Sequence, residues 1–124
     1  MKDEGGRPPR DLGERTRAFA VRVMRLGDSL PHTRSANVIA YQLIRSGSSV
    51  GAQYREALRA RSDAEMISKF EGALMELEET AYWMSLLVDL ELVPSSKMTP
   101  LREEAGELTA ILVASVKKLK ARRR

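Results

Sequence analysis

Cysteine is absent from this chain of 124 residues, histidine occurs once, and aromatic residues make up only 5%. Without cysteine the protein can form no disulfide and perform no thiol chemistry, and zinc sites built on cysteine are excluded. This composition suits a reducing compartment, so we expect the protein in the cytoplasm. The single histidine, His32, follows Pro31 in an expected loop, where we interpret it as a surface residue.

The sequence also lacks the features of membrane-bound and linker-rich proteins. Five prolines and eight glycines are too few for a disordered chain. No apolar run reaches the roughly 18 residues that a transmembrane helix needs. The charged N-terminal segment has no apolar core of the kind found in signal peptides. We therefore expect one domain with no membrane partner, preceded by a flexible tail over residues 1–10.

Enzyme motifs are missing as well. The chain contains no Walker loop, no GxGxxG turn and no nucleophile elbow. Bundles with a di-iron centre need Glu-x-x-His motifs on facing helices, and the only histidine lies outside the helical patterns. The segment 47–51 resembles a glycine-rich loop but has no lysine after it, and it lies within a helical pattern. We expect no catalytic residue, no metal and no cofactor.

Apolar residues recur at helical spacing in four segments. Intervals of three and four residues place these side chains on one stripe of each helix. The four stripes are Leu12, Thr16, Phe19, Val23, Leu26, Leu30; then Ala36, Ala40, Leu43, Gly47, Val50, Tyr54, Ala57; then Met66, Phe70, Ala73, Leu77, Ala81, Met84, Val88; and Leu101, Ala105, Leu108, Leu112, Ser115, Leu119. The sequence therefore predicts an all-α fold, an antiparallel up-down-up-down four-helix bundle over residues 11–121, with a basic tail over 122–124.

Local signals mark where these helices begin and end. Pro31 closes the first segment, and Thr33 is a candidate N-cap of the second. Ser62 and Glu65 form a candidate capping box at the start of the third. The pair 99–100, a threonine followed by proline, is expected to open the fourth helix.

Two glycines lie in the middle of the second helical segment. Gly47 and Gly51 each cost up to about 1 kcal/mol relative to alanine in a helix. Small residues on either side of them extend the same patch. We expect close approach of another helix here, and a hinge or kink is the alternative interpretation.

Charge is unevenly distributed along the chain. The formal net charge is +4, yet residues 62–92 contain eight acids and only one base, Lys69. One interpretation is that an acidic helix pairs with basic neighbours inside the bundle. The other is a basic surface meant for a polyanion.

Glutamates in the second and third helices suggest two interhelical links. An antiparallel turn near Arg61 brings Glu56 within reach of Lys69 and Glu76 close to Arg45. We predict two polar pairs, Glu56–Lys69 and Arg45–Glu76, that fix helix register and partner choice. Catalysis by Glu56, Glu76 and Glu79 is the less favoured alternative.

The same part of the chain resembles a known family. The residues that carry the resemblance are Arg45-Ser46, Ser49-Val50, Tyr54-Arg55-Glu56-Ala57, Arg61-Ser62, Lys69, Glu76 and Glu79-Thr80-Ala81-Tyr82-Trp83. They are similar to the motif of the four-helix bundle protein family, which includes proteins encoded within large-subunit rRNA intervening sequences. Gln53 stands where that family usually has asparagine, so the amide is kept on a longer side chain. We therefore include Gln53 among the expected structural polar links, with Arg45, Glu56, Lys69 and Glu76.

The resemblance implies a non-catalytic antiparallel bundle that assembles as a homo-oligomer, with a pentamer as the expected form. It also implies a relation to the accessory protein of diversity-generating retroelements, a basic pentamer that works with a reverse transcriptase and nucleic acid. RNA, DNA and a reverse transcriptase are therefore the expected partners besides the protein itself.

Basic side chains gather in three places outside the apolar stripes. The candidate nucleic-acid-binding residues are Arg15, Arg22, Arg25, Arg55, Arg59, Lys117, Lys118 and Lys120. Contacts of such groups with phosphates give salt-dependent binding that is largely independent of sequence. No exposed aromatic ladder for base stacking is expected, and Tyr82 and Trp83 are placed at an interface or a core edge.

Two functions follow from these observations. The first is a non-catalytic nucleic-acid-binding oligomer, an adaptor for an RNA or a reverse transcriptase. The alternative is a protein-interaction scaffold with no nucleic-acid role.

Overall fold

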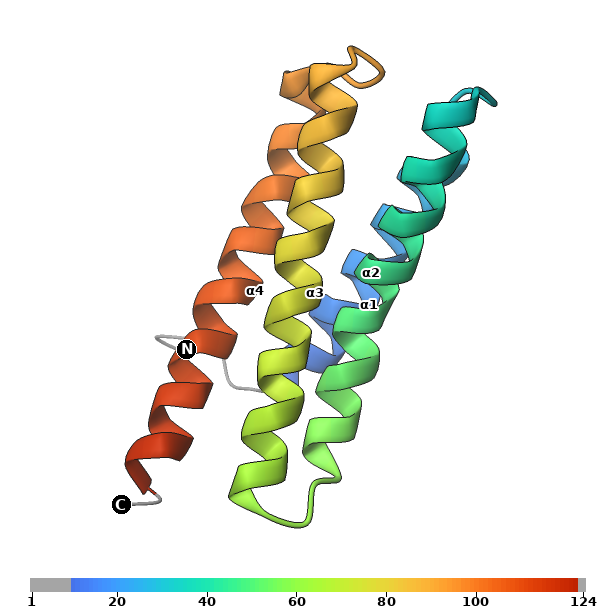
Figure 1. The fold of residues 1–124 in the computed structure, drawn as a ribbon. Coiled ribbons are helices and arrows are strands. Elements are labelled where there is room, and N and C mark those ends of the chain that lie inside the picture. Colours follow the sequence, from blue (N-terminus) through green and yellow to red (C-terminus); the bar gives the residue numbers. More distant parts are fainter. Residues whose placement is uncertain (1–9, 123–124) are drawn as a thin grey trace.

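Four helices in one antiparallel bundle make up the described part of the chain. The computed structural model describes residues 10–122. The helices are α1 (Arg10–Asp28), α2 (Arg34–Leu58), α3 (Asp63–Asp89) and α4 (Ser95–Arg122), and no strand occurs within these residues. Figure 1 shows the α1–α2 and α3–α4 connections at one end of the bundle and the α2–α3 turn at the other. The predicted all-α bundle is confirmed.

Each helix packs against its two neighbours in a closed ring of contacts. The pairs are α1 with α2, α2 with α3, α3 with α4, and α4 with α1, and the α1–α4 interface is the smallest. Arg10 begins α1 and Arg122 ends α4. Residues 1–9 of the expected N-terminal tail and residues 123–124 of the basic tail lie outside the described residues.

The predicted caps are present at two helices. Thr33 Oγ1 accepts a hydrogen bond from the Ala36 amide at 3.3 Å, and Ser62 Oγ accepts from the Glu65 amide at 3.1 Å. The Glu65 carboxylate does not reach back to Ser62 as a capping box requires; it accepts instead from the amide of Arg61 at 2.9 Å. The helix starts were therefore predictable, because a cap involves only neighbouring residues.

α4 begins earlier than the sequence predicts. The helix starts at Ser95, so Pro100 lies inside it. The Pro94 carbonyl accepts from the amides of Lys97 and Met98, which nucleates the first turn before Thr99 is reached. Pro100 is the sixth residue of α4, so its missing N–H leaves the Ser96 carbonyl without its usual helical donor, and this loss stays within the first two turns of the helix.

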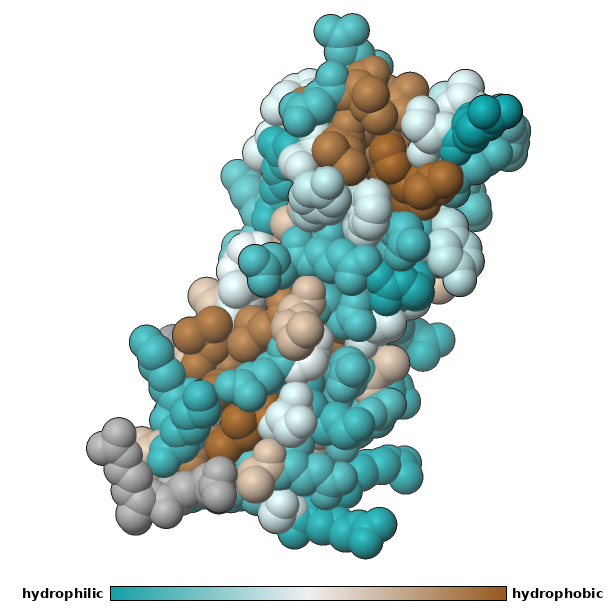
Figure 2. All heavy atoms as spheres, in the orientation of Figure 1, coloured by the Kyte–Doolittle hydropathy of each residue, from teal (hydrophilic) through white to brown (hydrophobic). Residues whose placement is uncertain are grey.

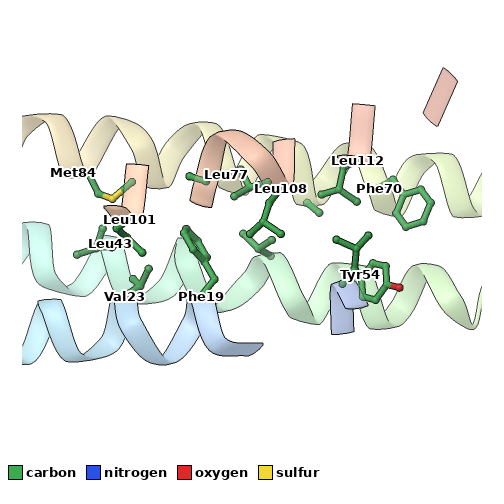
Figure 3. Close-up of a cluster of buried hydrophobic side chains, with 14 of the residues drawn as sticks. Phe19, Val23, Leu43, Tyr54, Phe70, Leu77, Met84, Leu101, Leu108 and Leu112 are labelled. Atoms are coloured by element: carbon green, nitrogen blue, oxygen red, sulfur yellow. The ribbon is translucent and has the colours of Figure 1, made fainter. Parts of the chain in front are cut away.

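The core runs along the centre of the bundle. Phe19 and Val23 of α1 point toward Leu43 of α2, Leu77 of α3 and Leu108 of α4 (Figure 3). Phe19, Val23, Leu43 and Leu108 have no exposed surface.

The predicted stripes of α1 and α2 lie inside this core, with Leu26 and Ala40 half-buried. In α3 the stripe was wrong at Ala81, which is exposed, whereas Thr80 and Leu87 are buried. In α4 Val116 is buried where Ser115 was predicted. The apolar stripes therefore predict which face of each helix forms the core. At these positions, however, the buried residue is the sequence neighbour of the predicted one.

The buried hydroxyl of Thr80 explains the shift in α3. Its Oγ1 donates to Ser46 Oγ of α2 at 2.8 Å and lies 2.7 Å from the Glu76 carbonyl oxygen. Both hydroxyl side chains are fully buried, and each is satisfied by a partner. A satisfied hydroxyl can occupy a core position, so Thr80 replaces the alanine that a purely apolar stripe would choose.

The small residues of α2 serve close packing with α1. A Cβ on Gly47 would lie 2.6 Å from Val23 Cγ1, and one on Gly51 would lie 3.2 Å from Thr16 Oγ1. α2 continues through both glycines without a break. The expected close approach is confirmed, and the glycines are not a helix boundary.

Candidate nucleic-acid interface

Both predicted polar pairs between α2 and α3 are present. Lys69 Nζ donates to Glu56 Oε1 at 2.7 Å, and Arg45 Nη1 lies 3.5 Å from Glu76 Oε1. The closer partner of Arg45 is Glu79, whose carboxylate also accepts from Trp83 Nε1 at 3.0 Å. The cluster of Arg45, Glu79 and Trp83 was not predicted from the sequence. Glu76 and Glu79 lie one helical turn apart on the same face of α3, so the spacing alone does not show which of them Arg45 approaches more closely.

Gln53 does not join these links. Its side chain forms no hydrogen bond within residues 10–122. Its amide lies instead over Gly72 of α3, where a Cβ would come within 3.0 Å of Gln53 Cδ and Oε1. Gln53 therefore fills a space between the helices, and Gly72 leaves room for it.

The Arg45 cluster makes the protein sensitive to acid. Hydrogen bonds from Arg45 and then Trp83 lower the pKa of Glu79 below its ordinary value of 4.5. A depressed carboxyl pKa adds stability above the unfolded pKa, and this stability is lost as the pH falls through the folded pKa. We expect wild type to be more stable than Glu79→Gln at pH 7, with the difference beginning to shrink as the pH falls below the ordinary pKa of 4.5 and disappearing only below the lowered pKa of Glu79.

Urea unfolding of both proteins at a series of pH values measures this difference. Glu78→Gln is the matched control, because Glu78 is exposed and forms no ion pair among the described residues. A Glu79→Gln difference that stayed constant down to pH 3 would contradict the assignment.

Arg15 joins α1 to α4 and is not a free surface cation. Its Nε and Nη2 donate to the Glu104 carboxylate at 3.0 and 2.7 Å, and Nη2 also donates to Glu107 Oε1 at 2.7 Å. These contacts, Glu104 first, raise the pKa of Arg15 above its ordinary value. The side chain is 24% exposed. The arginine predicted to contact phosphates is thus occupied by two carboxylates of its own chain.

Removing this link should weaken the smallest helix interface. We expect Arg15→Ala to lower the free energy of unfolding by about 1.5–3 kcal/mol, the range for hydrogen bonds to charged groups. It should leave binding of nucleic acid unchanged. Arg17→Ala, an exposed arginine on the same helix, should change stability by less than about 0.5 kcal/mol. Chemical denaturation of the two variants tests this, and equal effects would contradict it.

Toward the end of the bundle that carries the α2–α3 turn, acids of α3 pair with bases of α4. Lys120 Nζ lies 3.2 Å from Glu71 Oε2, and Arg122 donates to both carboxylate oxygens of Asp63 at 3.1 and 2.8 Å. Together with the Arg45 cluster, these pairs account for much of the charge of the acidic helix. The interpretation that α3 pairs with basic neighbours is therefore supported for Asp63, Glu71, Glu76 and Glu79.

Many cations remain unpaired after these contacts. The exposed basic residues that form no ion pair within residues 10–122 are Arg17, Arg22, Arg25, Arg34, Arg55, Arg59, Arg61, Lys97, Arg102, Lys117 and Lys118. None of them lies on α3.

Three of these cations surround the groove between α1 and α2. Arg17 of α1 and Arg55 of α2 line it beside Gly13 and Gly51, and Arg59 lines its continuation past Gly13. The other residues that line it between Arg17 and Arg55 are small, and all three arginines are exposed. The sequence predicted Arg55 and Arg59 but missed Arg17, because only the packing of α1 against α2 places Arg17 next to them.

Arg22 and Arg25 lie elsewhere. They line a groove between α1 and α4 at the end of the bundle that carries the α1–α2 and α3–α4 connections, together with Lys97. Lys117 and Lys118 are exposed near the end of α4, one helical turn before Arg122. The eight predicted residues therefore do not form one surface: Arg15 and Lys120 are paired, and the others fall into three separate regions.

Within the described residues, no cluster of three or more histidine or acidic side chains is arranged to hold a metal ion. None of the four described helices is both long enough and apolar enough to span a membrane.

Comparison with known proteins identifies the family. The model of the family described as 23S rRNA-intervening sequence protein matches residues 11–114. The chain belongs to this family. A crystal structure of a protein of unknown function from the S23 ribosomal protein family of Bacteroides thetaiotaomicron is similar, with 33% identity over 86% of this chain and 98% of that one. Its TM-score of 0.81 shows that the two share the bundle fold. No curated protein matches the chain.

Membership in the 23S rRNA-intervening sequence protein family agrees with the resemblance carried by residues 45–83. The matched segment begins in α1 and ends within α4, so it includes α2 and α3 completely, nearly all of α1 and most of α4.

Proposed function

We propose that this 23S rRNA-intervening sequence family member is a non-catalytic nucleic-acid-binding protein that acts as a homo-oligomer. The observation that carries the proposal is the group of unpaired arginines on the outer side of α1 and α2, Arg17, Arg55 and Arg59. Their charge has no partner within the described chain, so an external polyanion can neutralise it without breaking an internal ion pair.

The geometry favours contacts with phosphates over contacts with bases. Small residues line the groove between Arg17 and Arg55, and the aromatic ring that lines its continuation, Tyr54, is only 2% exposed and cannot stack a base. Binding through arginines alone positions a nucleic-acid backbone and carries no direct sequence information. An RNA or a DNA would therefore be held by its shape and charge, and the protein would serve as an adaptor for an RNA or for a reverse transcriptase acting on one.

Exposed apolar residues support self-association. The antiparallel packing of α2 and α3 brings the start of α2, with Val38 and Tyr41, beside the end of α3, with Tyr82 and the C-cap residue Leu90. Tyr41 is 68% exposed and Leu90 is 50% exposed. Figure 2 shows apolar side chains gathered on this face. A second copy covering this surface would bury it, and a ring of five subunits would present the basic groove five times.

Repetition would strengthen weak binding. Linking several identical sites makes each later contact effectively intramolecular, which raises the overall affinity. The homo-oligomer and the nucleic-acid surface are thus parts of one proposal.

Binding of a structured RNA hairpin and a DNA duplex of equal length tests the proposal. Fluorescence anisotropy at about 50 mM and about 200 mM salt should show tight binding that weakens by at least about tenfold at the higher salt. Light scattering on the same sample should give a mass of several subunits. A monomer that fails to bind either probe at the lower salt would overturn the proposal.

A protein-interaction scaffold is the second candidate. The observation that favours it is a largely apolar groove of about 500 Å³ between α3 and α4, which Leu74, Ala81 and Gly106 help to line. No binding of nucleic acid by an intact oligomer would leave this function as the better account.

A further inference from the structure

The groove between the end of α1 and the start of α4 combines an apolar floor with a basic rim. Its volume is about 540 Å³. Leu26 of α1, Leu30 of the α1–α2 connection, and Met98 and Leu101 of α4 form much of the floor. Arg22, Arg25 and Lys97 stand at its sides, and no acidic residue lines it.

The charges across this groove are of the same sign. Farther along the same interface, Arg15 of α1 faces Glu104 of α4, and the two form a direct ion pair. Two helical turns before Glu104, α4 carries Lys97 in place of an acid. The interface therefore changes from opposite charges to like charges as it approaches the end of the bundle.

Like charges facing one another lower the stability of the protein unless an anion lies between them. Arg22, Arg25 and Lys97 form no ion pair with any described residue. The first turn of α4 contains no acidic residue that could offset Lys97. The groove is thus complementary to a ligand that brings negative charge from outside.

The apolar residues at the floor of the groove determine which class of anionic ligand can bind there. A nucleic-acid backbone would place charged phosphates against leucine and methionine side chains, and no aromatic residue lines the groove to stack a base. A peptide that carries both carboxylates and large apolar side chains satisfies the rim and the floor together. An amphipathic helix lying in a hydrophobic groove uses this arrangement, with apolar anchors at i, i+3, i+4 and i+7.

We propose that the α1–α4 groove is a docking site for an acidic amphipathic segment of a partner protein, with Arg22, Arg25 and Lys97 binding its carboxylates. This assigns Arg22 and Arg25 to protein recognition and leaves nucleic acid to Arg17, Arg55 and Arg59. The protein then has two functional surfaces that share α1 and can be occupied at the same time.

Selection from a display library of random peptides tests this site. Peptides of about 16 residues are long enough for four helical turns. Wild-type protein is the target, and Arg22→Ala/Lys97→Ala serves for counter-selection. The enriched peptides should combine acidic residues with apolar residues at helical spacing. Their dissociation constants should rise at least about tenfold on the double variant, which is about 1.4 kcal/mol.

The matched control removes the same charge at the other surface. Arg55→Ala/Arg59→Ala should leave peptide affinity within about twofold while it weakens binding of the RNA hairpin. Lys97→Glu adds a second measurement, because a glutamate there can pair with Arg22 or Arg25. It should raise the melting temperature and abolish peptide binding.

Three results would contradict the proposal that this groove binds an acidic segment. These are the absence of any enriched acidic peptide, equal loss of peptide binding in both double variants, or loss of RNA binding that is larger for Arg22→Ala/Lys97→Ala than for Arg55→Ala/Arg59→Ala. The last result would assign the groove to nucleic acid.

Discussion

Replacing Gly47 with alanine is expected to destabilise the protein by about 1–3 kcal/mol, the usual cost of overpacking a core. The added Cβ would lie 2.6 Å from Val23 Cγ1 and 3.0 Å from Val23 Cβ. Because Val23 is fully buried, it cannot move aside without displacing its own neighbours. Alanine would gain up to about 1 kcal/mol of helix propensity, which is too little to offset this clash.

Gly106 provides the matched control. It also lies inside a helix, yet a Cβ there would meet nothing within 4 Å. The same substitution should therefore stabilise the protein by up to about 1 kcal/mol. Urea denaturation of Gly47→Ala and Gly106→Ala measures both values. Stabilisation by Gly47→Ala would contradict the close packing of α1 on α2.

Truncation of Phe19 is expected to have the largest effect on stability. Phe19→Ala should lower the free energy of unfolding by about 3–5 kcal/mol, the range for buried aromatic residues. Phe19 is fully buried and points into the core shared by all four helices (Figure 3). Its removal leaves a cavity that Val23 and Leu108 cannot fill without leaving their own positions.

Met24 serves as the control on the same helix. It is 40% exposed, so Met24→Ala should change stability by less than about 0.5 kcal/mol. Thermal and urea unfolding of the two variants would separate the effects. A loss at Phe19 no larger than at Met24 would show that α1 does not belong to the core.

Local features of this bundle were predictable from the sequence, because they involve residues within one helical turn. The caps at Thr33 and Ser62 belong to this group, as do the apolar stripes of α1 and α2. The pairs Glu56–Lys69 and Arg45–Glu76 lie farther apart but follow from a single short turn, which fixes the register of α2 against α3.

Features that depend on packing between distant segments were not predictable. Thr80 is buried because Ser46 of α2 accepts its hydroxyl, and only the folded register brings the two together. Arg15 is bound by Glu104, 89 residues later, so the sequence could not show that this candidate nucleic-acid-binding residue is already paired within the bundle.

Packing between distant segments also explains why two residues of the candidate surfaces, Arg17 and Lys97, were not predicted from the sequence. Arg17 joins Arg55 through the packing of α1 on α2. Lys97 joins Arg22 because α4 begins at Ser95, before the predicted start. Charge can be counted from sequence, but whether a cation is free depends on partners that the fold supplies.

The salt dependence of RNA binding tests the central claim most directly. Each phosphate contact contributes about 0.9 to the slope of log K against log salt on a duplex. We predict that Arg55→Ala/Arg59→Ala lowers this slope by at least about 1.5, whereas Lys120→Ala/Arg122→Ala, which removes cations already paired with Glu71 and Asp63, changes it by less than about 0.5. Equal slopes for the two variants would contradict the account, because free and paired cations would then contribute alike.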